Sequence, residues 1–250
     1  VSGADPYLFD VNVTTAITHS FSADLDITIT SPSGTVVTLT TDNGGSNDNV
    51  FNGTVWDDDA NPAGQVPYTS NNGLATDHAY SNLVLASPLV PEEALGAFIG
   101  ENPNGTWTIT ISDDLSGDVG NLNSWGLSIT TLPSAPVTSN TSFSASPAIA
   151  IADNNVIAST INVTGISTYL MKLNVTTFIR HTFSADLDIT ITSPSGTVVT
   201  LTTDNGGSND NIFNGTVWND NANPGGQVPY GSNNGMVTDQ TYTNAVVATP

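Results

Sequence analysis

The sequence predicts an all-β protein that contains two tandem copies of one unit. Residues 21–68 return at 183–230, shifted by 162 positions, and the two 48-residue stretches differ at only four places. Such a faithful repeat makes the repeat the unit of structure. Thr, Ser, Asn, Val, Ile and Gly dominate, whereas Lys and Arg together number two, and this bias favours strands joined by tight turns. The four differences are Val50/Ile212, Asp57/Asn219, Asp59/Asn221 and Ala63/Gly225.

The first unit opens with a strand and a hairpin. Residues 7–17 alternate between apolar and polar side chains, which predicts a strand with one dry face. Residues 25–30 alternate in the same way, and residues 31–34 (Ser-Pro-Ser-Gly) have the chemistry of a turn. Residues 35–41 then return as the partner strand, so residues 25–41 are expected to form a hairpin.

The rest of the first unit alternates short apolar segments with long polar loops. The expected elements are a polar loop at 42–49, a short apolar segment at 50–56, a Gly-, Asn- and Pro-rich excursion that reaches Leu85, one helical turn within 91–98, and strands at 106–112 and 125–132.

The expected domains are residues 1–132, a linker at 133–150 that is rich in Ser, Thr, Pro and Ala, and residues 151–250. In the second unit, residues 157–163 and 169–179 are expected to be strands. The alignment gives residues 157–162 no counterpart in the first unit, and residues 89–132 none in the second. The second unit is therefore expected to be incomplete at its C-terminus. Its open sheet edges would be completed by a longer array of repeats or by a neighbouring chain.

The charge balance restricts the partners of the chain. There are 23 acidic side chains against Lys172 and Arg180, which gives a formal charge of −21. The acids cannot be paired within the chain, so they must face water or hold cations. Nucleic acid and anionic membrane surfaces are therefore poor partners. The sequence also has no cysteine and no apolar run of the ~18 residues that a membrane span requires.

The acidic loops indicate calcium. Three consecutive carboxylates, at residues 57–59, repel one another unless a cation lies between them. Calcium takes six to eight oxygen ligands of the kinds that these loops offer. The alternative is a set of solvated turns, which Asp and Asn also favour. The predicted calcium ligands are Asp42, Asp48, Asn49, Asp57, Asp58 and Asp59 in the first unit, and Asp204, Asp210, Asn211, Asn219, Asp220 and Asn221 in the second.

The second unit differs in this loop, because Asn219 and Asn221 replace two of the three aspartates. We expect Asp58 and Asp220 to be central ligands and the second site to be weaker or differently coordinated. Residues 113–118 form a further acidic loop, for which metal binding and a solvated hairpin end remain open.

Three predictions concern the core. His19 is expected to be a structural histidine that is bonded to backbone or to Asp24. Asp26 is expected to be exposed, because it lies on the polar side of an alternating strand. The tryptophans at 56, 107 and 125 are expected to lie in the core and not on a carbohydrate platform.

The chain resembles the P domain, or P/Homo B domain, of proprotein convertases and bacterial secreted proteases. The matching motifs are His19 with Asp24-Leu25, Ser-Pro-Ser-Gly-Thr at 31–35, Gly-Glu-Asn-Pro-Asn-Gly-Thr-Trp at 100–107 and Leu-Asn-Ser-Trp at 122–125. The first two recur at His181 with Asp186-Leu187 and at 193–197. The resemblance implies a jelly-roll-like β-sandwich, a non-catalytic module beside a protease domain or in a large surface protein, and calcium binding.

Three functions remain open at this point. The first is a calcium-binding structural or adhesive repeat of a secreted or cell-surface protein, which assembles with copies of itself into a linear array or filament and shares strands with its neighbours. The second is an accessory pair for an upstream subtilisin-like or metalloprotease domain. The third is a carbohydrate- or protein-binding module that uses the 64–85 excursion. An enzyme is not expected, because the sequence has neither a Gly-x-Ser-x-Gly nor a His-Glu-x-x-His motif.

Overall fold

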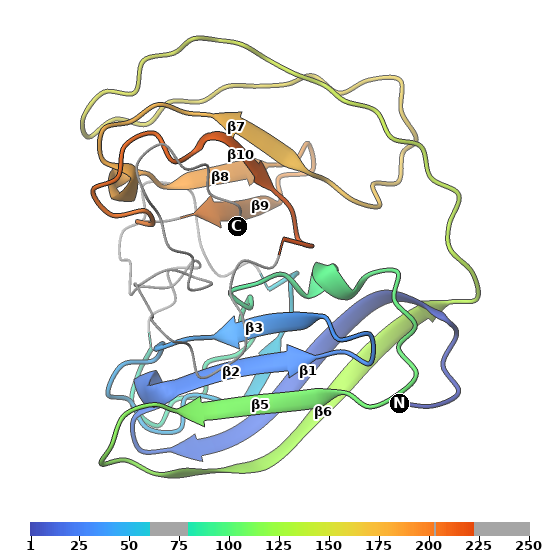
Figure 1. Cartoon of the computed structure of the whole chain (residues 1–250), viewed down its shortest axis with the longest axis vertical. Helices are drawn as coiled ribbons and strands as arrows, with labels where there is room; N and C mark the ends of the chain where they lie inside the picture. The colour runs from blue at the N-terminus through green and yellow to red at the C-terminus, as the bar shows by residue number, and fades with distance from the viewer. Residues whose placement is uncertain (61–79, 203, 223–250) are drawn as a thin grey trace.

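The computed structural model describes residues 1–60, 80–202 and 204–222. Figure 1 shows two β units, which a long strand-free connection joins. We call them copy 1, within residues 1–132, and copy 2, within residues 151–250. Over the described ranges the only helical elements are three short 3₁₀ turns, and the prediction of an all-β fold is confirmed. None of these turns is long and apolar enough to cross a membrane.

The first sheet of copy 1 is centred on β1 (Tyr7–His19), the long alternating strand. It pairs antiparallel with β4 (Asn52–Trp56) on one side and with β6 (Gly120–Leu132) on the other. The pairing with β6 extends over the whole length of β1, from Tyr7 opposite Leu132 to His19 opposite Gly120. The end of β1 therefore lies where β6 begins.

The second sheet of copy 1 is centred on β2 (Leu25–Thr30), which follows the 3₁₀ turn η1 (Ser22–Asp24). It pairs antiparallel with β3 (Val36–Thr40), which confirms the predicted hairpin, and with β5 (Thr108–Asp113). Leu25 lies opposite Asp113, so the start of β2 and the end of β5 meet at the same end of the sandwich.

One hydrophobic core fills copy 1, with Phe51 against Trp56 and Phe98 against Trp107 at ring-centroid distances of 5.4 and 5.0 Å. Phe98 ends η2 (Leu95–Phe98), the 3₁₀ turn found where a helical turn is predicted. The predicted core positions of Trp56 and Trp107 are confirmed, and Trp125 packs half-buried against the same core. Burial of side chains of this size contributes about 1.5–3 kcal/mol each.

Two sheet edges of copy 1 are covered by the chain that returns from the long excursion. At the edge of β4, Leu89 N donates to Val55 O at 2.9 Å, and Asp57 N donates to Leu89 O at 2.9 Å. At the edge of β3, the backbone of Glu92 and Glu93 donates to the carbonyls of Leu39 and Thr38 at 3.1 and 3.0 Å. These contacts satisfy edge groups that would otherwise pair with another chain.

Copy 2 repeats the arrangement with fewer strands over residues 151–202 and 204–222. β7 (Val175–Phe178) pairs with β10 (Asn214–Trp218), and β8 (Ile189–Thr192) pairs with β9 (Val198–Thr202), all antiparallel. The 3₁₀ turn η3 (Ser184–Asp186) repeats η1. Among its described residues the buried core is small and consists of Leu187, Ile212, Phe213 and Trp218.

Two expectations are wrong, and both errors concern neighbours that a single strand does not reveal. Asp26 is buried, with 2% of its surface exposed, because the returning segment that carries Glu92 covers this face of the sheet. Residues 157–163 form no strand in the structure, and of the predicted strand at 169–179 only β7 forms. A strand needs a partner for its backbone groups.

Candidate functional site

Several charged side chains lie at the end of copy 1 where β1, β2 and β5 meet. His19 ends β1, Asp24 closes η1, and Asp113 ends β5. His19 is buried, and its Nε2 lies 3.2 Å from Asp113 Oδ2. Asp24 is also buried, and its backbone carbonyl accepts a hydrogen bond from Asp114 N at 3.0 Å. The prediction that His19 is bonded to backbone is confirmed, because its Nδ1 lies 2.7 Å from Phe21 O. Its carboxylate partner is Asp113 and not Asp24.

Five carboxylates influence one another at this end, and we call them the acidic cluster: Asp24, Asp42, Asp113, Asp114 and Asp118. Burial raises the pKa of Asp24, the charges of Asp118 and Asp113 raise it further, and His19 opposes the shift. Burial also raises the pKa of Asp42, and the charges of Asp114 and Asp24 add to this effect. Nearby carboxylate charges therefore make the ionisation of Asp24 and Asp42 harder.

The cluster takes only one of the three ligands predicted in the 42–49 loop, Asp42. Asn49 instead fixes the loop, because its Oδ1 accepts from His19 N and its backbone N donates to His19 O, both at 2.9 Å. Asp48 contacts the returning excursion, where its N donates to Asn82 Oδ1 at 2.6 Å. Of the two acids in this loop, Asp42 therefore joins the acidic cluster, whereas Asp48, like Asn49, contacts a neighbouring segment.

The second predicted group, Asp57–Asp59, has its oxygens largely engaged in hydrogen bonds. Asp57 accepts from Asn12 Nδ2 at 3.1 Å and from Asp59 N at 2.9 Å. Asp58 caps η2, because its two oxygens accept from Leu95 N and Gly96 N at 2.9 and 2.7 Å. Burial raises the pKa of Asp58 to about 6 against these two hydrogen bonds, and the charge of Asp220 contributes to the rise.

Copy 2 repeats the geometry of both predicted loops. Asp204 and Asn211 have the same positive φ, 52° and 58°, as their counterparts in copy 1, and Asn211 N donates to His181 O at 2.9 Å. Asn219 Oδ1 accepts from Asn221 N at 2.9 Å, as Asp57 does from Asp59. Asp210 occupies the position of Asp48 in the repeat.

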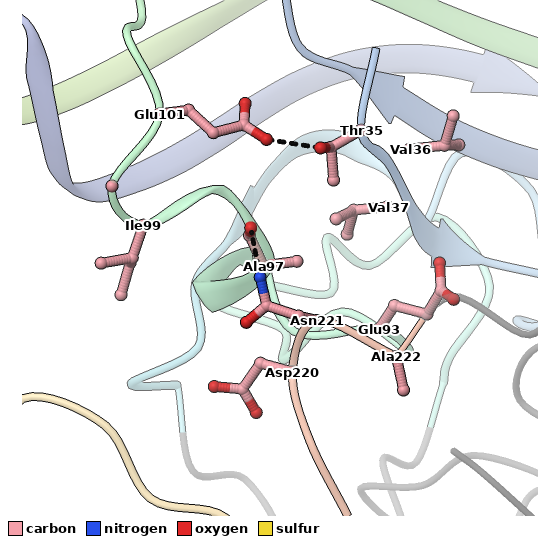
Figure 2. A pocket seen from close by; sticks show the side chains of 11 residues that line it. Thr35, Val36, Val37, Glu93, Ala97, Ile99, Glu101, Asp220, Asn221 and Ala222 are labelled. Atoms are coloured by element: carbon pink, nitrogen blue, oxygen red, sulfur yellow. Dashed lines mark hydrogen bonds between the residues drawn. The ribbon is translucent and has the colours of Figure 1, made fainter. Parts of the chain in front are cut away.

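The loop at 219–221 reaches copy 1. A Cβ placed on Gly96 would lie 2.9 Å from Asp220 Oδ2 and 3.5 Å from Asp58 Oδ2, so the two aspartates approach η2 together. Asn221 Nδ2 also donates to Ala97 O at 3.4 Å (Figure 2). Burial raises the pKa of Asp220, and Lys172 opposes this shift. Asp58 and Asp220, which are predicted to be central calcium ligands, therefore lie at a contact between the copies.

A cavity of about 340 Å³ lies beside this contact. Glu93 and Glu101 line it from copy 1, and Asp220 and Asn221 line it from copy 2 (Figure 2). Each glutamate has one oxygen held by copy 1: Thr38 N donates to Glu93 Oε2 at 2.7 Å, and Thr35 Oγ1 donates to Glu101 Oε1. The other oxygen of each is buried without a hydrogen-bond partner, and burial raises the pKa of Glu93.

Sequence reasoning missed the buried glutamate pair Glu92 and Glu93. Glu92 accepts from Thr41 N at 2.8 Å, from Thr41 Oγ1 at 2.9 Å and from Asn43 Nδ2. Burial raises its pKa to about 8, although these hydrogen bonds oppose the shift. The available signal was a pair of acids inside an otherwise apolar stretch, residues 89–99.

The chemistry of these sites is that of cation attraction and proton binding. In the described ranges, no three His, Asp or Glu side chains gather closely enough to hold a metal ion by themselves. Both ring nitrogens of His19 have hydrogen-bond partners, since Nδ1 lies 2.7 Å from Phe21 O and Nε2 faces Asp113. It therefore positions loops and is not a free base.

The family model of the proprotein convertase P-domain matches residues 8–129 and 170–227, which is more than half of the chain. The two matched segments correspond to copy 1 and copy 2. No curated protein matches the chain as a relative. The chain belongs to the proprotein convertase P-domain family, in two tandem copies.

Proposed function

We propose that this chain is a calcium-stiffened structural repeat of a secreted or cell-surface protein and that it assembles with further copies into a linear array. P-domains are non-catalytic domains that accompany secreted proteases, and this coarser role follows from family membership. The array is supported by the repeat itself, because two β units that share a nearly identical 48-residue stretch follow one another in a single chain. Repetition of this kind is typical of arrays in which each unit contacts its neighbours.

Contacts between the copies support a mechanical role. The loop at 219–221 lies against η2 of copy 1 through Asp220 and Asn221. Phe9 of copy 1 stacks on Tyr169 of copy 2, with ring centroids 6.3 Å apart. A pair of units that touch at two places transmits force better than two units on a free linker.

The acidic cluster supports calcium as the stiffening ion. The charges of its members raise the pKa values of Asp24 and Asp42, so a divalent cation among them would relieve this repulsion. The donors are carboxylate oxygens, which calcium prefers, and the chain has no cysteine for softer metals. Asp24, Asp42 and Asp114 do not gather closely enough to hold an ion by themselves, so backbone carbonyl and water oxygens would have to complete the shell, and calcium would supply positive charge and rigidity there.

A second candidate function is an accessory pair that stabilises or targets a secreted subtilisin-like or metalloprotease domain. Family membership favours it, since P-domains usually accompany a protease domain. A protease partner is expected to dock on one copy and leave the chain otherwise monomeric. The third function, a binding module on the 64–85 excursion, falls mainly on residues 61–79, which lie outside the described ranges.

Imaging tests the proposal directly. The purified chain is examined by negative-stain electron microscopy in millimolar calcium and then in chelator. Linear assemblies that shorten or disperse in chelator are expected. Monomers under both conditions would overturn the array, and a stable complex with an added protease domain would favour the accessory function.

A further inference from the structure

The outer edge of β5 is open in the described part of the chain. β5 pairs with β2 on one side, and no other described strand pairs with it. Ile109 and Ile111 on this strand are only half-buried, although they pack against the core of copy 1. An edge of this kind presents unpaired backbone groups and apolar side chains to another strand.

The N-terminal residues of copy 1 pair with the turn that precedes β5. Val1 N donates to Gly105 O at 2.9 Å, and Gly105 N donates to Val1 O at 3.0 Å. Two residues that exchange both hydrogen bonds form an antiparallel pair. Ala4 N also donates to Asn104 Oδ1 at 3.0 Å, which holds the following residues beside the same turn. A strand that enters the repeat at this position therefore runs antiparallel to β5.

The repeat identifies the sequence of such a strand. Val163 has the position in copy 2 that Val1 has in copy 1, since the shift is 162 residues. The preceding residues, Val-Ile-Ala-Ser-Thr-Ile-Asn at 156–162, are rich in β-branched side chains, which favour strands. They form no strand in the structure, and Ile157 and Ile161 are 37% and 50% exposed. Within copy 2, β8 pairs only with β9 among the described residues, so this segment has no β5 counterpart there.

The antiparallel pair fixes a register. Counted from Val163 opposite Gly105, Ile161 falls opposite Trp107, and Ile157 falls opposite Ile111. Trp107 is buried and Ile111 packs on the core, so both isoleucines would face inward and cover half-buried apolar surface. A slip by one residue would turn Ala158, Thr160 and Asn162 inward instead, and a packed face disfavours that arrangement.

We propose that the outer edge of β5 is an acceptor for residues 156–163 of a second copy of this chain. The inference rests on the proposed function, because it requires contact between chains, and it names the strand and the register of that contact. Each chain carries one acceptor, β5, and one donor, residues 156–163. A contact between unlike surfaces of this kind propagates into a filament unless it closes into a ring.

Engineered cysteines test the register, because the natural chain has none. Ala158 falls opposite Thr110 at a pair without mutual hydrogen bonds, where side chains approach most closely. One full chain carries Ala158→Cys, another carries Thr110→Cys, and the two are mixed under mild oxidation. A disulfide-linked heterodimer is expected. The matched control is Ser159→Cys with Thr110→Cys, whose side chains point to opposite faces, and we expect at least tenfold less cross-linking.

A second measurement removes the apolar anchor. Ile161→Asp lies in an exposed segment, so circular dichroism of this variant is expected to match the natural chain. Sedimentation velocity should show concentration-dependent oligomers for the natural chain and monomers for Ile161→Asp. Equal cross-linking of Thr110→Cys to Ala158→Cys and to Ser159→Cys would overturn the proposal. So would a chain that carries both Ala158→Cys and Thr110→Cys and forms the disulfide only within itself. Linear assemblies without the 158–110 cross-link would refute this strand contact alone, whereas cross-linked dimers without linear assemblies would refute the array alone.

Discussion

Buried carboxyl groups set the residue-scale chemistry of copy 1, and Glu92 is the clearest case. Its pKa is raised to about 8 by burial, whereas an unfolded glutamate titrates near 4.5. The folded state therefore keeps a proton that the unfolded chain loses. The resulting contribution to stability is complete below pH 4.5 and is lost as the pH rises through about 8. Each pKa unit corresponds to about 1.4 kcal/mol.

We expect the free energy of unfolding of the natural chain to fall by several kcal/mol between pH 5 and pH 8.5, at ~1.4 kcal/mol per unit of pKa shift. Glu92→Gln, which cannot ionise, should flatten this dependence. Urea unfolding followed by tryptophan fluorescence at the two pH values measures it. Asp153→Asn, on an exposed loop, serves as the control and should leave the dependence unchanged. If the free energy of unfolding of Glu92→Gln falls equally steeply with pH, a group other than Glu92 is responsible for the pH dependence.

Asp58 and Asp220 occupy the same position in two loops but have different contacts, which makes them a matched pair. Asp58→Ala leaves the N–H groups of Leu95 and Gly96 without their acceptors, and each loss of this kind costs about 1–3 kcal/mol. Asp220→Ala removes a side chain that lies beside Gly96 from the other copy. We expect a lower urea midpoint for Asp58→Ala than for Asp220→Ala. Equal midpoints would show that the cap on η2 contributes nothing.

At the scale of elements, the 42–49 loop depends on a close approach to η1. Gly44 has a φ of +97°, and a Cβ there would lie 2.7 Å from Ser22 Cβ. Gly45 also has a positive φ, +58°, but a Cβ there meets nothing closer than 3.9 Å. Both Gly→Ala substitutions pay for the left-handed backbone, at about 1 kcal/mol. Only Gly44→Ala adds a clash with Ser22, so its thermal midpoint should be several degrees lower than that of Gly45→Ala. Equal thermal midpoints for the two variants would refute the close packing of the loop on η1.

The elements that sequence reasoning predicted well are those whose residues alternate strictly. The hairpin at 25–41 and the long strand β1 follow from period-2 patterns and a Pro-Ser-Gly turn. The pattern of β2 could not place Asp26, because burial of its polar face depends on a segment more than sixty residues away that returns over the sheet. Alternation reports the character of each face, not what covers it.

The candidate site was predicted at the level of loops and not of ligands. Asp42 joins the acidic cluster, but Asn49 is tied to His19, and Asp58 is tied to η2. Asp and Asn serve equally as metal ligands and as caps for local backbone, so composition alone cannot separate the two uses. The acidic cluster also contains Asp113, Asp114 and Asp118, which are distant from Asp24 in sequence but close in space because β5 lies next to β2.

At the scale of the whole molecule, a formal charge of −21 makes protons and cations compete for the same groups. Burial and mutual repulsion raise the pKa values of Asp24 and Asp42, so protonation stabilises the fold as the pH falls. A calcium ion would neutralise the same repulsion, but it requires the ionised carboxylates. Acid and calcium should therefore stabilise copy 1 under opposite conditions.

The thermal midpoint is expected to rise in calcium, and to rise more at pH 8 than at pH 5. Binding stabilises the folded state by about 2.7 kcal/mol when free calcium is a hundred times the dissociation constant. Differential scanning calorimetry in about 10 mM calcium chloride is compared with the same measurement in sodium chloride of equal ionic strength. The comparison separates specific binding from screening. In the double variant Asp42→Asn with Asp114→Asn, calcium should no longer raise the thermal midpoint beyond the rise that sodium gives, and the rise in sodium should remain. If sodium reproduces the whole effect, the acids act as a diffuse field and hold no ion, because a bound divalent cation cannot be replaced by screening alone.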